Sequence, residues 1–168
     1  MDRKTNTKVP AIAIHPYRLA DAADTLAIFL AAVTETAAAD YTPEQIQAWA
    51  RPEERQLSTW HAAMQARYSC VATVNGEPAG FSDVDAQGYV DMMFVDPRFL
   101  RMGVAHQLLA HVEAHARAGG LAQLSANVSI TARPFFERHG FVVKEEQHPV
   151  MIGVQLTNFA MTKDMPGN

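Results

Sequence analysis

The chain has 168 residues, of which 48% are hydrophobic and 19% are charged, and its formal net charge is −4 at pH 7. This is the composition of a folded globular domain, and the negative charge argues against nucleic acid as a partner, because a nucleic-acid surface needs a basic face. Its single cysteine, Cys70, excludes an internal disulfide, and the longest purely apolar run, residues 27–33, is too short to span a bilayer. We therefore expect one domain over residues 1–168, with residues 1–10 flexible, no membrane partner and a cytoplasmic location.

The first part of the chain predicts one strand followed by helices. Residues 12–18 alternate between apolar and polar and predict a strand, which Pro16 places at a sheet edge. A helix follows, because apolar residues recur on one helical face: Leu26, Phe29, Leu30, Val33 and Ala37. Residues 42–45, Thr-Pro-Glu-Gln, form a capping box that starts a second helix. A further helix is expected over residues 53–66.

Three strands in a meander come next, and the third leads into a glycine loop. Residues 69–74 and 78–85 flank Asn75-Gly76, a hairpin signal because both residues tolerate positive φ. Residues 89–95 are rich in Val, Met, Phe and Tyr and form the third strand. Gly103 then lets the backbone approach a ligand, and a helix beginning near Met102 presents free N–H groups and its positive dipole end. Together they predict an anion site of the kind that holds a pyrophosphate.

The rest of the chain completes a mixed α/β fold. The helix after the loop ends at Gly119-Gly120. Residues 121–128 predict a strand, which the helical crossover makes parallel to strand 89–95. A short helix over residues 129–140 and a final hairpin follow, with strands at 141–147 and within 150–161. The order β-α-α-β-β-β-α-β-α-β-β predicts a mixed, mostly antiparallel central sheet flanked by helices.

Two motifs are similar to those of the GNAT acyltransferase superfamily. Val95-Asp-Pro97 followed by Leu100-Arg-Met-Gly103-Val-Ala105 resembles its V-x-P…[RQ]-x-x-G-x-[GA] phosphate loop. Ser129-x-x-Ala132-x-x-Phe135-Phe136-x-x-x-Gly140-Phe141 resembles its N-x-x-A-x-x-[FL]-Y-x-x-x-G-F segment. The two together, separated by one helix and one strand, are fairly specific. The resemblance to a GNAT N-acetyltransferase covers residues 12–163.

This resemblance implies an enzyme that moves the acetyl group of acetyl-CoA to an amine of a small molecule or peptide. In that family, backbone groups of the third strand line the thioester and pantetheine arm, here at Met93, Phe94 and Val95. The loop holds the pyrophosphate, here at Arg101, Met102, Gly103, Val104, Ala105 and His106. Other residues border or wall the cofactor: Asn127, Ser129, Phe135 and Phe136. The helices before and after residues 39–42 flank the acceptor groove, which Tyr41 and Trp49 could shape, although core packing explains Trp49 equally well.

The chain departs from the family pattern at two positions. Leu100 replaces the usual Arg or Gln, although Arg101 could supply the charge from a shifted position. Phe136 replaces the Tyr that commonly protonates the departing thiolate. Another group or water could serve, or no strong acid is needed, because a thiol of pKa about 8.5 is a tolerable leaving group. The missing Tyr keeps open a second function, a non-catalytic acyl-CoA-binding module.

Asp91 is the leading candidate for the catalytic base. It lies in an otherwise apolar strand, and two-residue periodicity puts it on the same face as Met93 and Val95, near the expected thioester. The alternative is that Asp91 pairs with a neighbouring arginine or backbone group. Asp83 and Asp85, across the hairpin, are substitutes as a base or as ligands of a cationic acceptor, or they are solvated strand-end residues.

Three further assignments are structural or negative. His111 and His115 share a helix face, but the order H-x-E-x-H differs from the zinc-protease order H-E-x-x-H, so we expect no metal. A nucleotide-binding protein is disfavoured because no Gly-Lys-Ser/Thr follows the loop. The terminal strands leave a homodimer open.

Overall fold

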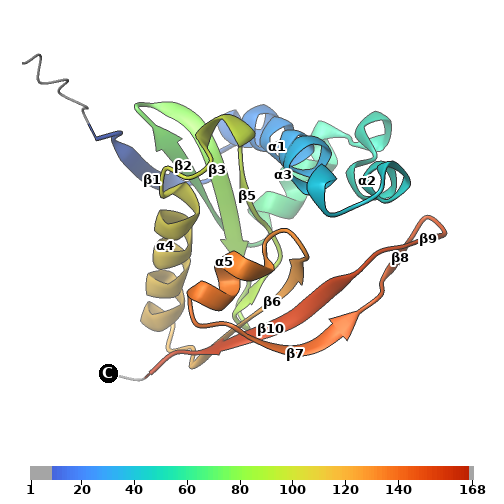
Figure 1. Ribbon diagram of the computed structural model, residues 1–168. Coiled ribbons are helices and arrows are strands. Elements are labelled where there is room, and N and C mark those ends of the chain that lie inside the picture. The colour runs from blue at the N-terminus through green and yellow to red at the C-terminus, as the bar shows by residue number, and fades with distance from the viewer. Residues whose placement is uncertain (1–8, 167–168) are drawn as a thin grey trace, which may run out of the picture.

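Within residues 9–166, which the computed structural model describes, the centre of the fold is a pair of four-stranded sheets (Figure 1). The first sheet is antiparallel, in the order β1 (Ile12–Pro16), β2 (Tyr68–Val74), β3 (Glu77–Val84) and β5 (Met93–Val95). The second has the order β4 (Tyr89–Val90), β6 (Gln123–Ser129), β10 (Asn158–Asp164) and β7 (Val142–Gln147). In it β4 runs parallel to β6, and the other pairs are antiparallel. Of the segment 1–10 predicted to be flexible, residues 1–8 lie outside the described part.

The helices pack against the faces of these sheets. Three lie between β1 and β2, a region described in full: α1 (Ala22–Ala31), α2 (Pro43–Ala50) and α3 (Leu57–Gln65). The long helix α4 (Val104–Ala118) and the short helix α5 (Arg133–Arg138) precede and follow β6. α1 continues into a π-helical turn over Ala32–Thr36 and a 3-10 turn over Ala37–Ala39. A small hairpin, β8 (Val150–Met151) and β9 (Val154–Gln155), projects between β7 and β10 (Figure 1).

Local sequence signals explain several of these boundaries. The Thr42 hydroxyl accepts the Gln45 N–H at 3.2 Å, and the Gln45 side chain accepts the Thr42 N–H at 2.9 Å, which confirms the predicted capping box. Asn75 and Gly76 have φ of 50° and 84° and join β2 to β3 as predicted. α4 begins at Val104, two residues later than predicted, because Arg101 and Gly103 have left-handed backbones (φ 61° and 89°) that a right-handed helix cannot include.

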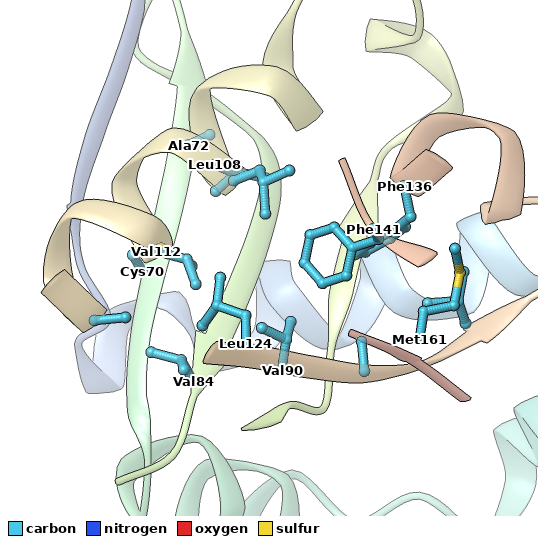
Figure 2. Packing of buried hydrophobic residues seen from close by; sticks show 14 of the residues in the cluster. Cys70, Ala72, Val84, Val90, Leu108, Val112, Leu124, Phe136, Phe141 and Met161 are labelled. Carbon is cyan, nitrogen blue, oxygen red and sulfur yellow. The ribbon is translucent and has the colours of Figure 1, made fainter. Parts of the chain in front are cut away.

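The core lies on both faces of the first sheet. On one face, Leu108 and Val112 of α4 pack with Cys70, Ala72 and side chains from the second sheet, all shown in Figure 2 with Val84, Val90, Leu124, Phe136, Phe141 and Met161. On the other face, α1 and α3 pack against Val71 and Phe81. Because β2 is covered on both sides, four consecutive residues, 69–72, are buried, and three of them, Cys70, Val71 and Ala72, are apolar.

One helical segment, residues 19–39, is long and apolar enough by length and composition to cross a membrane, with a mean hydropathy of 1.4. The segment is longer than the purely apolar run of residues 27–33, because the helix also includes residues on both sides of that run. Ile28, Phe29 and Val33 of this segment are buried in the core beside Trp60. Its apolar stripe is therefore used to cover the first sheet.

The predicted class, a mixed and mostly antiparallel α/β fold flanked by helices, is confirmed, and three details are corrected. The further helix predicted over residues 53–66 is confirmed as α3, although it begins only at Leu57, so three helices precede β2 where the predicted order has two. The last long strand is β10, with β8 and β9 inserted before it. The predicted strand 89–95 is divided into β4 and β5 by Asp91 and Met92, so one sheet becomes two.

Candidate functional site

The site is built around the break between β4 and β5. Val90 of β4 pairs with Ala126 of β6, whereas Met93 of β5 pairs with Ser82 of β3. The segment therefore begins at the edge of the second sheet and ends at the edge of the first. Beyond the break, β5 and the second half of β6 are no longer paired, and a groove opens between them.

A buried carboxylate holds the backbone at this break. Asp83 Oδ1 accepts the N–H of Asp91 at 2.8 Å and the N–H of Met92 at 3.0 Å. The Ser82 hydroxyl and the Asp83 N–H both donate to Met92 O. Asp83 is fully buried, and its Oδ2 has no hydrogen-bond partner among the described residues. Burial raises the pKa of Asp83 to about 6, against the lowering effect of the Met92 N–H.

The backbone of β5 presents free groups to the groove. The Asp96 N–H donates to Ala79 O, and Met92 O accepts from Asp83, so alternate residues of this segment bond to β3. The intervening residues, Met93 and Val95, direct their N–H and C=O groups the opposite way. Since β5 is an edge strand, these groups face the groove and can bind an extended amide-containing ligand.

One end of the groove is a cavity of about 490 Å³, here called the loop cavity. It contains most of the predicted cofactor-binding residues: Met93, Phe94, Val95, Arg101, Gly103, Val104, Ala105, His106, Ser129, Phe135 and Phe136. Of the other two, Asn127 lines the neighbouring cavity, and Met102 packs against the core and lines neither. The π-helical turn supplies Ala32 and Thr36 to the opposite wall.

The phosphate-type loop has the predicted geometry at its glycine. Gly103 has φ 89°, and a Cβ at this position would meet only Ile12 Cδ1 at 3.9 Å, so the requirement for glycine is one of backbone conformation. The Gln107 N–H donates to Gly103 O, which leaves the N–H groups of the first turn of α4 without an acceptor inside the helix. These amides border the loop cavity, where an anion would also meet the positive end of the helix.

Two histidines meet beside this loop. His106 Nδ1 lies 2.9 Å from His139 Nε2, and His139 Nδ1 lies 2.8 Å from Phe135 O. A carbonyl oxygen only accepts, so His139 Nδ1 carries the hydrogen, and its Nε2 accepts from His106 when the ring is neutral. His139 thus bonds the last turn of α5, and it also orients His106 at the loop cavity.

The other end of the groove is a cavity of about 420 Å³, here called the aromatic cavity. Its apolar walls include Phe29, Trp49, Trp60, Tyr89, Met92 and Phe94. Its polar side chains include Tyr41, Arg51, Arg55, Asp91 and Asn127. The two cavities share the wall formed by Trp49, Met93, Phe94, Ser129, Ala132 and Phe136. A ligand in one cavity can therefore meet a ligand in the other at this wall.

Asp91 lines the aromatic cavity, outside any strand. Its Oδ2 lies 3.7 Å from Arg67 Nη1, and both side chains are partly exposed. Asp91 therefore has a neighbouring arginine, as the alternative interpretation expected, and its carboxylate also borders the aromatic cavity. The two aspartates predicted as substitutes line neither cavity. Asp83 is buried and bonded to the N–H groups of Asp91 and Met92, and Asp85 accepts the N–H groups of Gln87 and Tyr89 within the turn.

Other predicted or missed residues also have defined places. Phe136 is buried against Phe135 and Phe141, and its ring brings no hydroxyl to the shared wall. The Tyr41 hydroxyl donates to Thr157 O at 2.6 Å and accepts the Ile130 N–H at 3.0 Å.

The sequence did not point to Arg51, Arg55 or Trp60 as cavity residues. The one available signal was the pair of arginines around Pro52, which is not specific.

The two helix histidines pack with a tyrosine. His111 Nε2 lies 2.7 Å from the Tyr68 hydroxyl, and the Tyr68 ring stacks on His115 at 3.6 Å. Among the residues that the structure describes, no group of three or more His, Cys, Asp and Glu side chains is placed to hold a metal ion. Burial and then the nearby His115 lower the pKa of His111.

Comparisons with known proteins agree with this geometry. Residues 37–163 match the model of the acetyltransferase (GNAT) domain family. The chain is 39% identical over 150 residues to the uncharacterized N-acetyltransferase YafP of Escherichia coli K12, covering 89% of this chain and 94% of that protein. It is 32% identical to a GCN5-related N-acetyltransferase from Rhodopseudomonas palustris of known structure, with a TM-score of 0.87 over 94% of this chain and 97% of that one.

A more distant structure shows the same fold with a ligand. It is the PaiA N-acetyltransferase of Thermoplasma acidophilum in complex with coenzyme A, with a TM-score of 0.74 and 17% identity over 92% of this chain and 99% of that one. The family match, the identity to two relatives and the two-cavity groove confirm the resemblance identified from the two motifs. The chain belongs to the GNAT acetyltransferase family.

Proposed function

We propose that this protein transfers the acetyl group of acetyl-CoA to the amine of a small molecule or peptide. The observation that carries the proposal is the shared wall at Met93 and Phe94. It joins a cavity with free helix and strand amides to a cavity that holds a carboxylate. Acetyl transfer needs these two environments side by side, because two reactants must be held in contact.

The loop cavity fits coenzyme A by its chemistry. The first-turn amides of α4 and the backbone around Gly103 would hold the pyrophosphate, with Arg101 and His106 adding positive charge or donors. The free N–H and C=O groups of Met93 and Val95 would bind the amides of the pantetheine arm as an added strand would. When bound, acetyl-CoA supplies a thioester whose C–S bond is exchanged for a C–N bond to the acceptor.

The shared wall and the aromatic cavity beside it would then do three things. A backbone N–H of β5 that faces the groove would polarise the thioester carbonyl. The aromatic cavity would hold the acceptor and exclude water from its apolar part. Asp91 would take the proton that the amine loses as its nitrogen attacks. Phe136 offers no proton, so the thiolate would take one from solvent or from another group.

Calorimetric titration with CoA and a thiol-release assay with acetyl-CoA and a panel of amines test this proposal. We expect CoA to bind and at least one amine to raise the rate of thiol release above the rate of hydrolysis. Absence of CoA binding would contradict both the loop assignment and the transferase.

The alternative function, a non-catalytic acyl-CoA-binding module, is favoured by one observation. Phe136 stands at the shared wall where the family's general acid is expected. Tight binding of acetyl-CoA without thiol release for any amine of the panel would support this alternative. Turnover with any amine would exclude it.

A further inference from the structure

We infer that the acceptor carries a carboxylate in addition to its amine, and that Arg51 and Arg55 bind this carboxylate in the aromatic cavity. The inference deepens the proposed function and rests on it for the identity of the ligand as an acceptor. It starts from the contacts of the two arginines. Both line the cavity, and both come from the connection between α2 and α3.

Arg51 is placed at the cavity by the end of α2. Its backbone is left-handed, with φ 43°, and its N–H donates to Gln47 O, which ends the helix. Its Nε is buried and has no hydrogen-bond partner among the described residues. The Arg51 Nη1 lies 3.8 Å from Glu54 Oε2, but this pair is solvent-exposed and so holds the side chain weakly. The guanidinium is therefore available to a ligand.

Arg55 is held more firmly. Its Nε donates to Ala50 O at 3.0 Å, and its Nη2 donates to Trp49 O at 2.8 Å. Its guanidinium also lies over the Phe29 ring, 4.7 Å from the ring centroid. These contacts fix the plane of the group and use two of its five N–H donors. The remaining donors can bind a second acceptor without further ordering of the side chain.

The charges at this end of the cavity are not balanced. Arg51 and Arg55 line the same cavity, and the pKa of Arg55 is lowered by burial and then by repulsion from the Arg51 charge, which the carboxylate of Glu54 opposes without cancelling. Asp91 is the one acidic side chain lining the aromatic cavity among the described residues, and it already pairs with Arg67. An anionic ligand between Arg51 and Arg55 would offset this repulsion. A carboxylate matches the planar donor fork of arginine.

The walls define the rest of the ligand. Phe29, Trp49 and Trp60 line the same cavity, so the ligand has an apolar or aromatic body. The class that combines these features is an amino acid or small peptide with a free carboxylate. A polyamine, with a second positive charge in place of the carboxylate, would be repelled by the arginines.

The tryptophans allow a direct binding test. The chain has two, Trp49 and Trp60, and both line the aromatic cavity, so intrinsic fluorescence reports on it. The probes are 3-phenylpropionate and its neutral analogue 3-phenylpropanamide, titrated into the protein alone. We expect the carboxylate to bind at least about tenfold more tightly than the amide. Equal responses to the two probes, or no response to either, would overturn the inference.

Variants assign the effect to the arginine. Arg51→Gln should weaken binding of the carboxylate probe about tenfold and leave the amide within about twofold. Arg117→Gln removes the same charge from α4, away from the cavity, and should change neither. Glu54→Gln removes the carboxylate that pairs with Arg51 at the surface, so the carboxylate probe should bind more tightly to this variant. An Arg51→Gln protein that behaves like Arg117→Gln would contradict the assignment.

An activity measurement separates this inference from the proposed function. Thiol release is compared for phenylalanine and phenylalaninamide, which differ in the carboxylate. A higher kcat/KM for phenylalanine, lost in Arg51→Gln, supports both. Turnover with a preference for the amide would overturn the carboxylate site and leave the transferase intact. If the carboxylate probe binds more tightly than the amide probe but no amine is acetylated, the carboxylate site at Arg51 and Arg55 is supported and the transferase is contradicted.

Discussion

Asp83 and Met92 are joined twice: Asp83 Oδ1 accepts the Met92 N–H at 3.0 Å, and the Asp83 N–H donates to Met92 O at 3.1 Å. The same Oδ1 accepts the Asp91 N–H, so a buried carboxylate satisfies two amides that no neighbouring strand pairs. This contact separates β4 from β5 and opens the groove. The position of the site therefore depends on a residue that lines neither cavity.

Removal of this carboxylate should destabilise the fold. Asp83→Ala leaves the N–H groups of Asp91 and Met92 buried without an acceptor, and we expect a loss of about 2–4 kcal/mol in the free energy of unfolding. Asp83→Asn keeps a carbonyl oxygen at the same place and should cost much less. Urea unfolding followed by circular dichroism measures both. Equal losses for Ala and Asn would show that the two amide contacts are not the source of the stability.

Asp83 should also make stability depend on pH. Its native pKa of about 6 lies above the ordinary value of 3.8, so the folded protein binds this proton more tightly than the unfolded chain. The resulting stabilisation is complete below the unfolded pKa of 3.8 and is lost as the pH rises through the native pKa of about 6. The change in the free energy of unfolding is on the order of 2–3 kcal/mol. The measurement is the unfolding free energy of wild type minus that of Asp83→Asn across this range. A difference that does not change with pH would contradict the shift.

Local signals in the sequence were sufficient for much of the fold. The capping box at Thr42 and the turn at Asn75-Gly76 depend on residues within four positions, and both are as predicted. The loop at Gly103 and the helix after it also depend on neighbouring residues. The second motif, residues 129–141, correctly predicted α5 and the strand that follows it. Most of the predicted cofactor residues therefore line one cavity.

Long-range contacts account for what the sequence did not reveal. The strand break at Asp91 follows from hydrogen bonds to Asp83, eight residues earlier, and no periodicity in residues 89–95 predicts it. The two-residue alternation used to place Asp91 thus stops at the break, although the side chain still borders the aromatic cavity. Arg51 and Arg55 converge because the chain turns left-handed at Arg51, which is unusual for a residue other than glycine.

The loop glycine gives a test of coenzyme A binding with a matched control. Gly103→Ala places a Cβ on a backbone of φ 89°, which costs about 1 kcal/mol or distorts the loop. We expect weaker binding of CoA in calorimetry. Gly120→Ala, after the other end of α4, meets the same backbone restriction at φ 76° with no atom within 4 Å. It should lower stability similarly and leave CoA affinity unchanged, and matching losses of affinity would reject the loop assignment.

The histidine pair predicts an effect specific to the phosphate end of the cofactor. His139→Phe removes the Nε2 atom that orients His106 at the loop cavity. A doubly protonated His106 would donate Nδ1–H to His139 and Nε2–H to a phosphate, so we expect CoA to bind several-fold more weakly when this orientation is lost. Acetylpantetheine, which lacks the pyrophosphate, is the control ligand. A similar loss for both ligands would indicate a general change in the cavity and not a contact with phosphate.

The assignment of Asp91 as the base predicts a change in rate with little change in cofactor binding. Asp91→Asn should lower kcat for thiol release by about 10²–10⁴, the usual contribution of general base catalysis. CoA affinity should stay the same, because Asp91 lines the aromatic cavity and not the loop cavity. Asp85→Asn removes the same charge from the preceding turn and serves as the control. If Asp91→Asn retained the kcat of Asp85→Asn, the carboxylate at position 91 would be a structural partner of Arg67.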